Sequence, residues 1–136
     1  MSVPSLRLTV LPGRYAVCRL AADAPLPAEP PRGGLWSATR TAGELSIVCA
    51  EADAPEGARC EPGWSCLAIE GPIPFSATGI MASVLQPLAA ARISIFALST
   101  YDTDAVMVPQ GALDAAVDAL SAAGHRVDRP ILDPAR

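Results

Sequence analysis

The spacing of apolar residues changes at about residue 78 of this 136-residue chain, and this change restricts the fold more than any other feature. Before it, residues 6–11 alternate apolar with polar side chains, which is the period of a half-buried β-strand. After it, apolar residues recur every three or four positions, which predicts an amphipathic helix over about 78–91. The chain therefore combines strands and helices.

The first half contains several short segments with the composition of strands and no helical pattern. Pro12-Gly13 is typical of a turn, so we expect 6–11 and 14–20 to form a hairpin. The stretch 22–34 is too rich in proline for a helix or a strand interior, and 51–63 is a polar connection with at most one helical turn. The expected strands of this half are 6–11, 14–20, 35–41 and 44–50.

The second half predicts the order strand, helix, strand, strand, helix, strand. This is the ferredoxin-like βαββαβ order, in which four antiparallel strands carry both helices on one face. Pro87 lies inside the first helix and removes the hydrogen bond to residue 83. Gly124 is the expected left-handed cap of the second helix. The expected segments are 64–71, 78–91, 94–98, 105–108, 109–124 and 125–128.

A weak internal repeat links the two halves. SATRTAGELSIV (37–48) echoes STYDTDAVMV (99–108), and Thr41 then aligns with Thr103. The distance from Cys18 to Thr41 is 23 residues and that from Cys66 to Thr103 is 37, so the first copy lacks about the length of one helix. We interpret the chain as two copies of one unit, the first degenerate, although short hairpins also resemble one another by chance. The predicted domains are 1–62, 63–128 and a loose tail, 129–136.

The motifs LPGRYAVCRL, TRTAGELSIVC and IEGPIPFSATGI with STYDTD resemble a bacterial family of small tandem ACT-domain proteins. This family is related to the ACT modules of the CASTOR arginine sensor. The resemblance implies an α+β fold of tandem ferredoxin-like (ACT-like) βαββαβ repeats, the first lacking its first helix. It also implies a regulatory module that binds an amino acid or another small effector near the loop 71–79. The chain departs from the family pattern at Arg92, where glycine is usual, and in the linker, which lacks a short Trp-containing helix.

An amino acid presents a carboxylate and an ammonium close together. The carboxylate needs free backbone N–H groups, which a helix start supplies, and the ammonium needs a carboxylate. The polar segment 99–104 carries two aspartates and several hydroxyl groups. It is either the polar edge of an effector site or an ordinary turn whose side chains bond their own backbone. The candidate ligand-binding residues are Gly71, Thr78, Gly79, Ile80, Ser99, Thr100, Asp102 and Asp104.

Composition disfavours several other classes. The net charge of −4 and the pI near 4.8 argue against nucleic-acid and anionic-membrane partners, which attract basic patches. No apolar run approaches the roughly 20 residues of a membrane span, and the N-terminus lacks the pattern of a signal peptide. We therefore expect a cytoplasmic protein, whose four cysteines are thiols. Their spacing fits no common zinc motif, so we expect neither a metal nor a cofactor.

Catalysis is poorly supported, because a single histidine offers no obvious nucleophile–base pair. We do not expect an enzyme. Two hypotheses remain: an amino-acid-binding regulatory module, and a ligand-free assembly module that pairs through its sheet edges. A homodimer is compatible with either.

Overall fold

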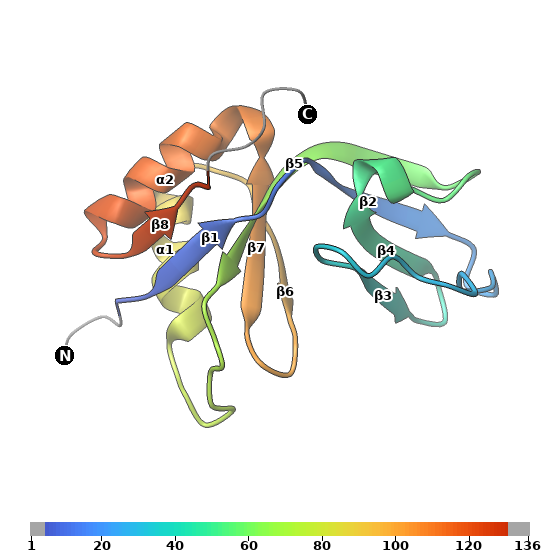
Figure 1. Ribbon diagram of the computed structural model, residues 1–136, viewed down its shortest axis with the longest axis horizontal. Coiled ribbons are helices and arrows are strands. Elements are labelled where there is room, and N and C mark those ends of the chain that lie inside the picture. The colour runs from blue at the N-terminus through green and yellow to red at the C-terminus, as the bar shows by residue number, and fades with distance from the viewer. Residues whose placement is uncertain (1–4, 131–136) are drawn as a thin grey trace. The chain divides into compact units, whose positions relative to one another are not determined.

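The structure is a computed structural model that describes residues 5–130, and the chain divides into two compact units (Figure 1). The described residues 5–12 and 65–130 belong to the larger unit, and Gly13–Trp64 form the smaller one. Strand β5 (Arg59–Ile69) crosses the boundary, so its first six residues belong to the smaller unit and the rest to the larger.

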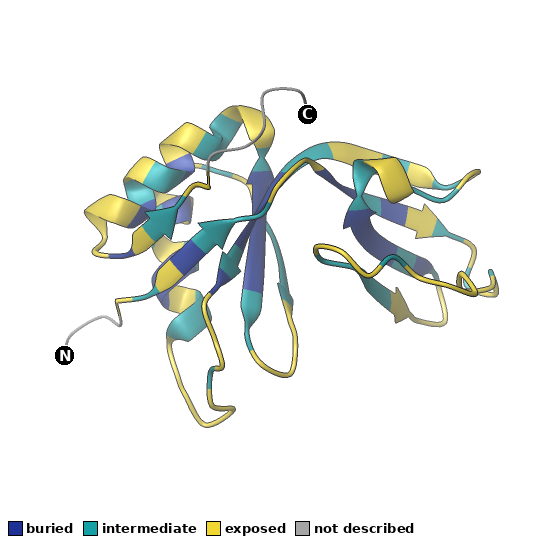
Figure 2. Cartoon of the chain, viewed as in Figure 1, coloured by how far each residue is buried: buried dark blue, intermediate teal, exposed yellow. Residues whose placement is uncertain are grey.

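The larger unit has the predicted βαββαβ order. After β5 come α1 (Ile80–Ala90), the hairpin of β6 (Phe96–Ser99) and β7 (Asp104–Pro109), the 3-10 turn η2 (Gln110–Ala112), α2 (Leu113–Ala122) and β8 (Arg126–Asp128). Both helices pack on one face of the sheet, because their buried residues share a core with one face of the strands (Figure 2). This core contains Leu8, Leu67, Ile69, Val84, Leu88, Val106, Val108, Ala116 and Leu120.

Strand β1 (Arg7–Val10) gives the larger unit a fifth strand, where the sequence predicted four. It lies between β5 and β8, antiparallel to the first and parallel to the second, in the order β8-β1-β5-β7-β6. The predicted hairpin with β2 (Tyr15–Leu20) is therefore wrong: β1 and β2 pair with opposite ends of β5 instead. Burial explains this choice, because Leu8 is fully buried in the core of the larger unit.

The position of β1 also bears on the predicted domains. The predicted first domain, 1–62, contains β1, whereas the structure groups β1 with the larger unit. The predicted tail begins at residue 129, and its residues 131–136 lie outside the described part of the chain.

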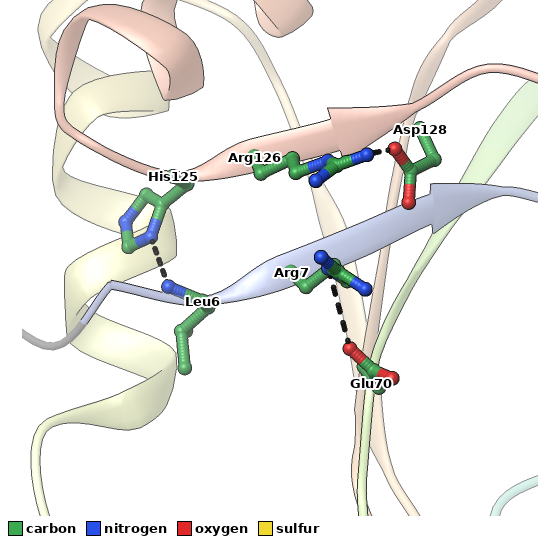
Figure 3. Close-up of polar contacts among 6 residues, drawn as sticks. All are labelled: Leu6, Arg7, Glu70, His125, Arg126 and Asp128. Atoms are coloured by element: carbon green, nitrogen blue, oxygen red, sulfur yellow. Dashed lines mark hydrogen bonds and ion pairs between the residues drawn. The ribbon is translucent and has the colours of Figure 1, made fainter.

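His125 completes the hydrogen bonding of α1 at Pro87. Because proline has no N–H, the carbonyl oxygen of Ser83 cannot receive the usual intrahelical bond. The Nε2 atom of His125 lies 2.8 Å from that oxygen. On the other side of the ring the Leu6 N–H donates to Nδ1 over 3.1 Å, as Figure 3 shows. These partners fix the neutral tautomer that carries its proton on Nε2. His125 is therefore a buried residue, with only 4% of it exposed.

The smaller unit is a reduced version of the same fold. It contains β2, β3 (Ser37–Arg40), β4 (Leu45–Ala50), the 3-10 turn η1 (Glu51–Asp53) and the start of β5. Their order, β3-β4-β2-β5, equals the order β6-β7-β5-β8 of the larger unit once β1 is left out. The prediction of tandem ferredoxin-like repeats, the first without its first helix, is confirmed.

The proline-rich linker stands where that helix would be. Two side chains from the strands hydrogen-bond to the backbone of this region. The Tyr15 hydroxyl accepts from the Leu35 N–H over 3.1 Å. The Arg40 guanidinium donates to the carbonyl oxygens of Ala22 and, over 2.7 Å, Ala24. Trp36 packs against the small core around Cys18 and Ile47. These contacts cover the strand residues that a helix would otherwise bury.

Candidate functional site

A hollow of about 340 Å³ opens beside the start of α1 in the larger unit, and we name it the α1 hollow. Three segments meet there: the loop from β5 to α1, the first turn of α1, and the turn between β6 and β7. The lining residues are Ile73, Pro74, Phe75, Ala77, Gly79, Ile80, Met81, Ala82, Ser99, Thr100, Tyr101, Thr103 and Asp104.

The first turn of α1 presents backbone N–H groups to the α1 hollow. The first helical bond runs from the Ser83 N–H to the Gly79 carbonyl over 2.9 Å, so the amides of Ile80, Met81 and Ala82 precede the intrahelical ladder. Within residues 5–130 no side chain caps this end. Gly79 is left-handed, with φ of 75°, a conformation that costs other residues about 1–2 kcal/mol. This end of the helix is suited to an anion.

The turn between β6 and β7 is organised largely by its own polar groups. The Thr100 N–H donates to the Thr103 carbonyl over 2.7 Å, and the Ser99 hydroxyl donates to Oδ1 of Asp104 over 2.5 Å. The ordinary-turn interpretation therefore accounts for part of this segment. It does not account for Oδ2 of Asp104, for which the described residues supply no hydrogen-bond partner, and Asp104 is one of the residues that line the α1 hollow.

This turn is fixed to the β5–α1 loop. The Thr103 hydroxyl donates to the Ile69 carbonyl over 2.7 Å, and the Ile73 N–H donates to the Asp102 carbonyl over 2.6 Å. A Cβ atom on Gly71 would lie 2.9 Å from that Asp102 oxygen and 3.0 Å from Cβ of Thr103. Gly71 is thus required for the close approach of the two loops, which together form one wall of the α1 hollow.

Two exposed aromatic rings lie at the edge of the α1 hollow. Phe75 and Tyr101 are 76% and 80% exposed, and their rings meet edge to face with centroids 4.8 Å apart. The two rings link the tips of both loops.

The α1 hollow brings together five of the eight predicted site residues: Gly79, Ile80, Ser99, Thr100 and Asp104. Gly71, Thr78 and Asp102 do not line it. Thr103, one of the hydroxyl residues of the segment 99–104, lines the hollow but was not among the candidates. The sequence reasoning also missed the apolar and aromatic part of the lining, namely Ile73, Pro74, Phe75, Ala77, Met81, Ala82 and Tyr101. The two aromatic residues within GPIPF and STYDTD were the available signal, since each is an apolar residue in an otherwise turn-like segment.

Other kinds of site find little support in residues 5–130. That part of the chain has no group of three or more His, Cys, Asp or Glu side chains placed to hold a metal ion. Nor does any helix in it have the length and apolar character needed to cross a membrane.

Comparison with known proteins agrees with the fold. The ACT domain family model matches residues 59–122, and a second model, of an N-terminal domain, matches residues 13–57. The chain is thus an ACT-domain protein, and ACT domains are regulatory ligand-binding modules. A search of the curated proteins gives no match.

Solved structures identify the family more narrowly. Protein Atu0741 from Agobacterium tumefaciens is 41% identical over 95% of this chain and 96% of its own, with a TM-score of 0.87. The chain belongs to the same protein family as Atu0741. Two remoter structures share the fold alone. VC0802 from Vibrio cholerae, a protein of unknown function, is 19% identical over 88% of this chain and 91% of its own, with a TM-score of 0.68. The regulatory subunit of aspartate kinase from Thermus thermophilus is 15% identical over 90% and 99%, with a TM-score of 0.59.

Proposed function

We propose that the larger unit is a sensor module that binds a free amino acid in the α1 hollow. One observation carries this proposal: backbone N–H groups at the start of α1 and the carboxylate of Asp104 line the same hollow. An amino acid is a small molecule that needs both, because its carboxylate and ammonium share one carbon atom.

In this proposal the two charged groups of the amino acid bind to different walls of the α1 hollow. The ligand carboxylate would accept hydrogen bonds from the amides of Ile80, Met81 and Ala82, where the helix dipole favours negative charge. The ligand ammonium, or a basic side chain, would bind Asp104. The volume is within the usual range for small-molecule sites. Basic and polar amino acids are the first candidates, because the wall supplies a carboxylate and hydroxyl groups.

We also propose that the module regulates without catalysing a reaction. His125 is the only histidine, and both of its ring nitrogens are engaged in hydrogen bonds inside the larger unit. It is therefore not available as a general base. Asp104, the acidic residue of the α1 hollow, can bind a cation and accepts a hydrogen bond from the Ser99 hydroxyl, but the lining includes no histidine that could act as a general base for that hydroxyl. The cytoplasm is the location that we predict.

A thermal-shift screen of the full chain against the twenty amino acids tests the binding proposal. A ligand at 100 times its dissociation constant stabilises the fold by about 2.7 kcal/mol, or about 10 °C for a chain of this length. We expect Asp104→Asn to abolish this shift, because it removes the charge that holds the ammonium. Asp102→Asn is the matched control: it removes the same charge two residues away, outside the lining, and should keep the shift.

The competing proposal is an assembly module without a ligand. It rests on the edge strands β3 and β6, each of which pairs on one side only within residues 5–130. If no amino acid shifts the melting temperature by one degree at millimolar concentration, and light scattering shows a dimer, this second function replaces the first. An equal loss of binding in Asp102→Asn and Asp104→Asn would contradict the proposed site.

A further inference from the structure

Three of the four cysteines belong to the smaller unit, whereas the α1 hollow belongs to the larger one. Cys18, on β2, and Cys49, on β4, belong to the buried core of that unit, and Cys60, on β5, packs against it half-exposed. Cys60 and Cys66 both lie within the single strand β5, but Cys66 belongs to the larger unit.

Cys18 and Cys60 are directly opposed on neighbouring strands. They are paired positions in the antiparallel ladder of β2 and β5, and their sulfur atoms are 2.6 Å apart. Opposed positions of antiparallel strands have Cα atoms about 4.5–5.5 Å apart, which is within the range that a disulfide bridges. The two side chains can therefore be joined without moving either strand. Cys49 is paired with Ala16 rather than with either residue.

A small oxidant can reach this pair. Cys18 and Cys60 line a second hollow, of about 460 Å³, which belongs entirely to the smaller unit. Cys60 is the accessible partner, whereas Cys18 is 1% exposed. Burial raises the pKa of the Cys18 thiol well above its usual range, with the hydrogen bond to Cys60 as the next cause. Because the thiolate is the reactive form, Cys60 is the side chain that an oxidant attacks first.

We propose that Cys18 and Cys60 form a reversible redox pair that closes to an intramolecular disulfide in the presence of a hydroperoxide. In the first step the Cys60 sulfur attacks one oxygen of hydrogen peroxide and the O–O bond breaks. The departing hydroxide takes the Cys60 proton to leave as water, and Cys60 becomes a sulfenic acid. In the second step the Cys18 sulfur attacks the Cys60 sulfur, the S–O bond breaks, and the departing hydroxide takes the Cys18 proton to leave as a second water. Two thiols are oxidised and one peroxide is reduced.

The closed pair joins β2 to the part of β5 that belongs to the smaller unit. Disulfides in reducing compartments are usually transient and redox-sensing rather than structural. The pair would make the stability of the smaller unit respond to oxidant, independently of any ligand in the α1 hollow.

The test is to treat the reduced full-length chain with one equivalent of hydrogen peroxide, alkylate the remaining thiols after unfolding, and map the disulfide by mass spectrometry. Trp64 lies between Cys60 and Cys66, so chymotrypsin separates these two cysteines. We expect two alkylated thiols, at Cys49 and Cys66, and one peptide pair that joins Cys18 to Cys60. A dithiol reductant should restore four reactive thiols, and the oxidised chain should melt at a higher temperature than the reduced one.

Two variants distinguish this pair from its neighbour. Cys60→Ser should lose the link to residue 60 and the rise in melting temperature, whereas Cys49→Ala should keep both. Four alkylated thiols after peroxide treatment, a wild-type link from Cys18 to Cys49, or a link between chains would each overturn the proposal. If Cys60→Ser does not fold, the wild-type peptide map decides by itself.

Discussion

The bond between His125 and Ser83 predicts a specific energetic coupling between His125 and Pro87. Pro87 takes the intrahelical donor away from the Ser83 carbonyl, and the His125 Nε2–H replaces it at 2.8 Å. Removing the imidazole should therefore lower the free energy of unfolding of the natural chain. The decrease should be smaller in a chain in which residue 87 has its own N–H.

The expected magnitudes follow from the groups left without partners. His125→Ala leaves the buried Ser83 carbonyl and the partly buried Leu6 N–H without partners, and a buried unpaired group costs about 1–3 kcal/mol. We therefore expect a loss of about 3 kcal/mol in the free energy of unfolding. In a Pro87→Ala background the new backbone N–H at position 87 can donate to Ser83, so only the Leu6 group is left and the loss falls by about 1–2 kcal/mol.

The assay is urea unfolding of the natural chain, the two single variants and the double variant, followed by circular dichroism and tryptophan fluorescence. Agreement between the two probes tests whether one free energy describes the transition. Arg126→Ala is the control, because the neighbouring Arg126 is exposed and its side chain bonds Asp128 at the surface (Figure 3), so its loss should cost less than about 1 kcal/mol. If the effects of the two substitutions add to within about 0.5 kcal/mol, the two residues are independent and the reasoning fails.

Two further predictions concern α1 and β5. Arg92 has φ of 60° just after α1, where the Ile93 N–H donates to the Leu88 carbonyl and closes the helix cap. Arg92→Gly should relieve the left-handed strain and raise the free energy of unfolding by about 1 kcal/mol in the same urea assay. An unchanged or lower free energy of unfolding would contradict this. Burial raises the pKa of the Cys66 thiol from 9.0 to about 12, so the unfolded chain loses this proton at a lower pH than the folded chain does. The contribution of the Cys66 thiol to the free energy of unfolding is therefore complete below pH 9 and should fall as the pH rises toward 12. Unfolding curves of the natural chain and Cys66→Ala between about pH 8 and 10.5 would check this, since the variant should lose less stability over that range.

The order of elements was predictable because it depends on local periodicity. The change from period two to a spacing of three and four residues places α1 within two residues of its predicted ends, 78–91 against Ile80–Ala90. Proline in 22–34 argues against a helix in that stretch for a reason that no tertiary contact can reverse, namely the missing N–H groups. The polar turn at 99–104 was also recognisable, since its side chains bond mostly within the segment.

The partners of the strands and of the buried polar groups depended on contacts far apart in the sequence. Pro12-Gly13 allows a hairpin, yet β1 pairs with β5 and β8, because burying Leu8 against Leu67 and Ile69 outweighs a local preference for a turn. His125 follows a helix, which suggests a surface position, and only the gap left by Pro87, far earlier in the chain, gives it a buried role. Gly71 is explained by the distant turn between β6 and β7, whose backbone touches it. A single sequence determines which groups are able to donate or accept a hydrogen bond and which are apolar enough to be buried. Which of these groups contact one another is determined only when distant segments of the chain pack together.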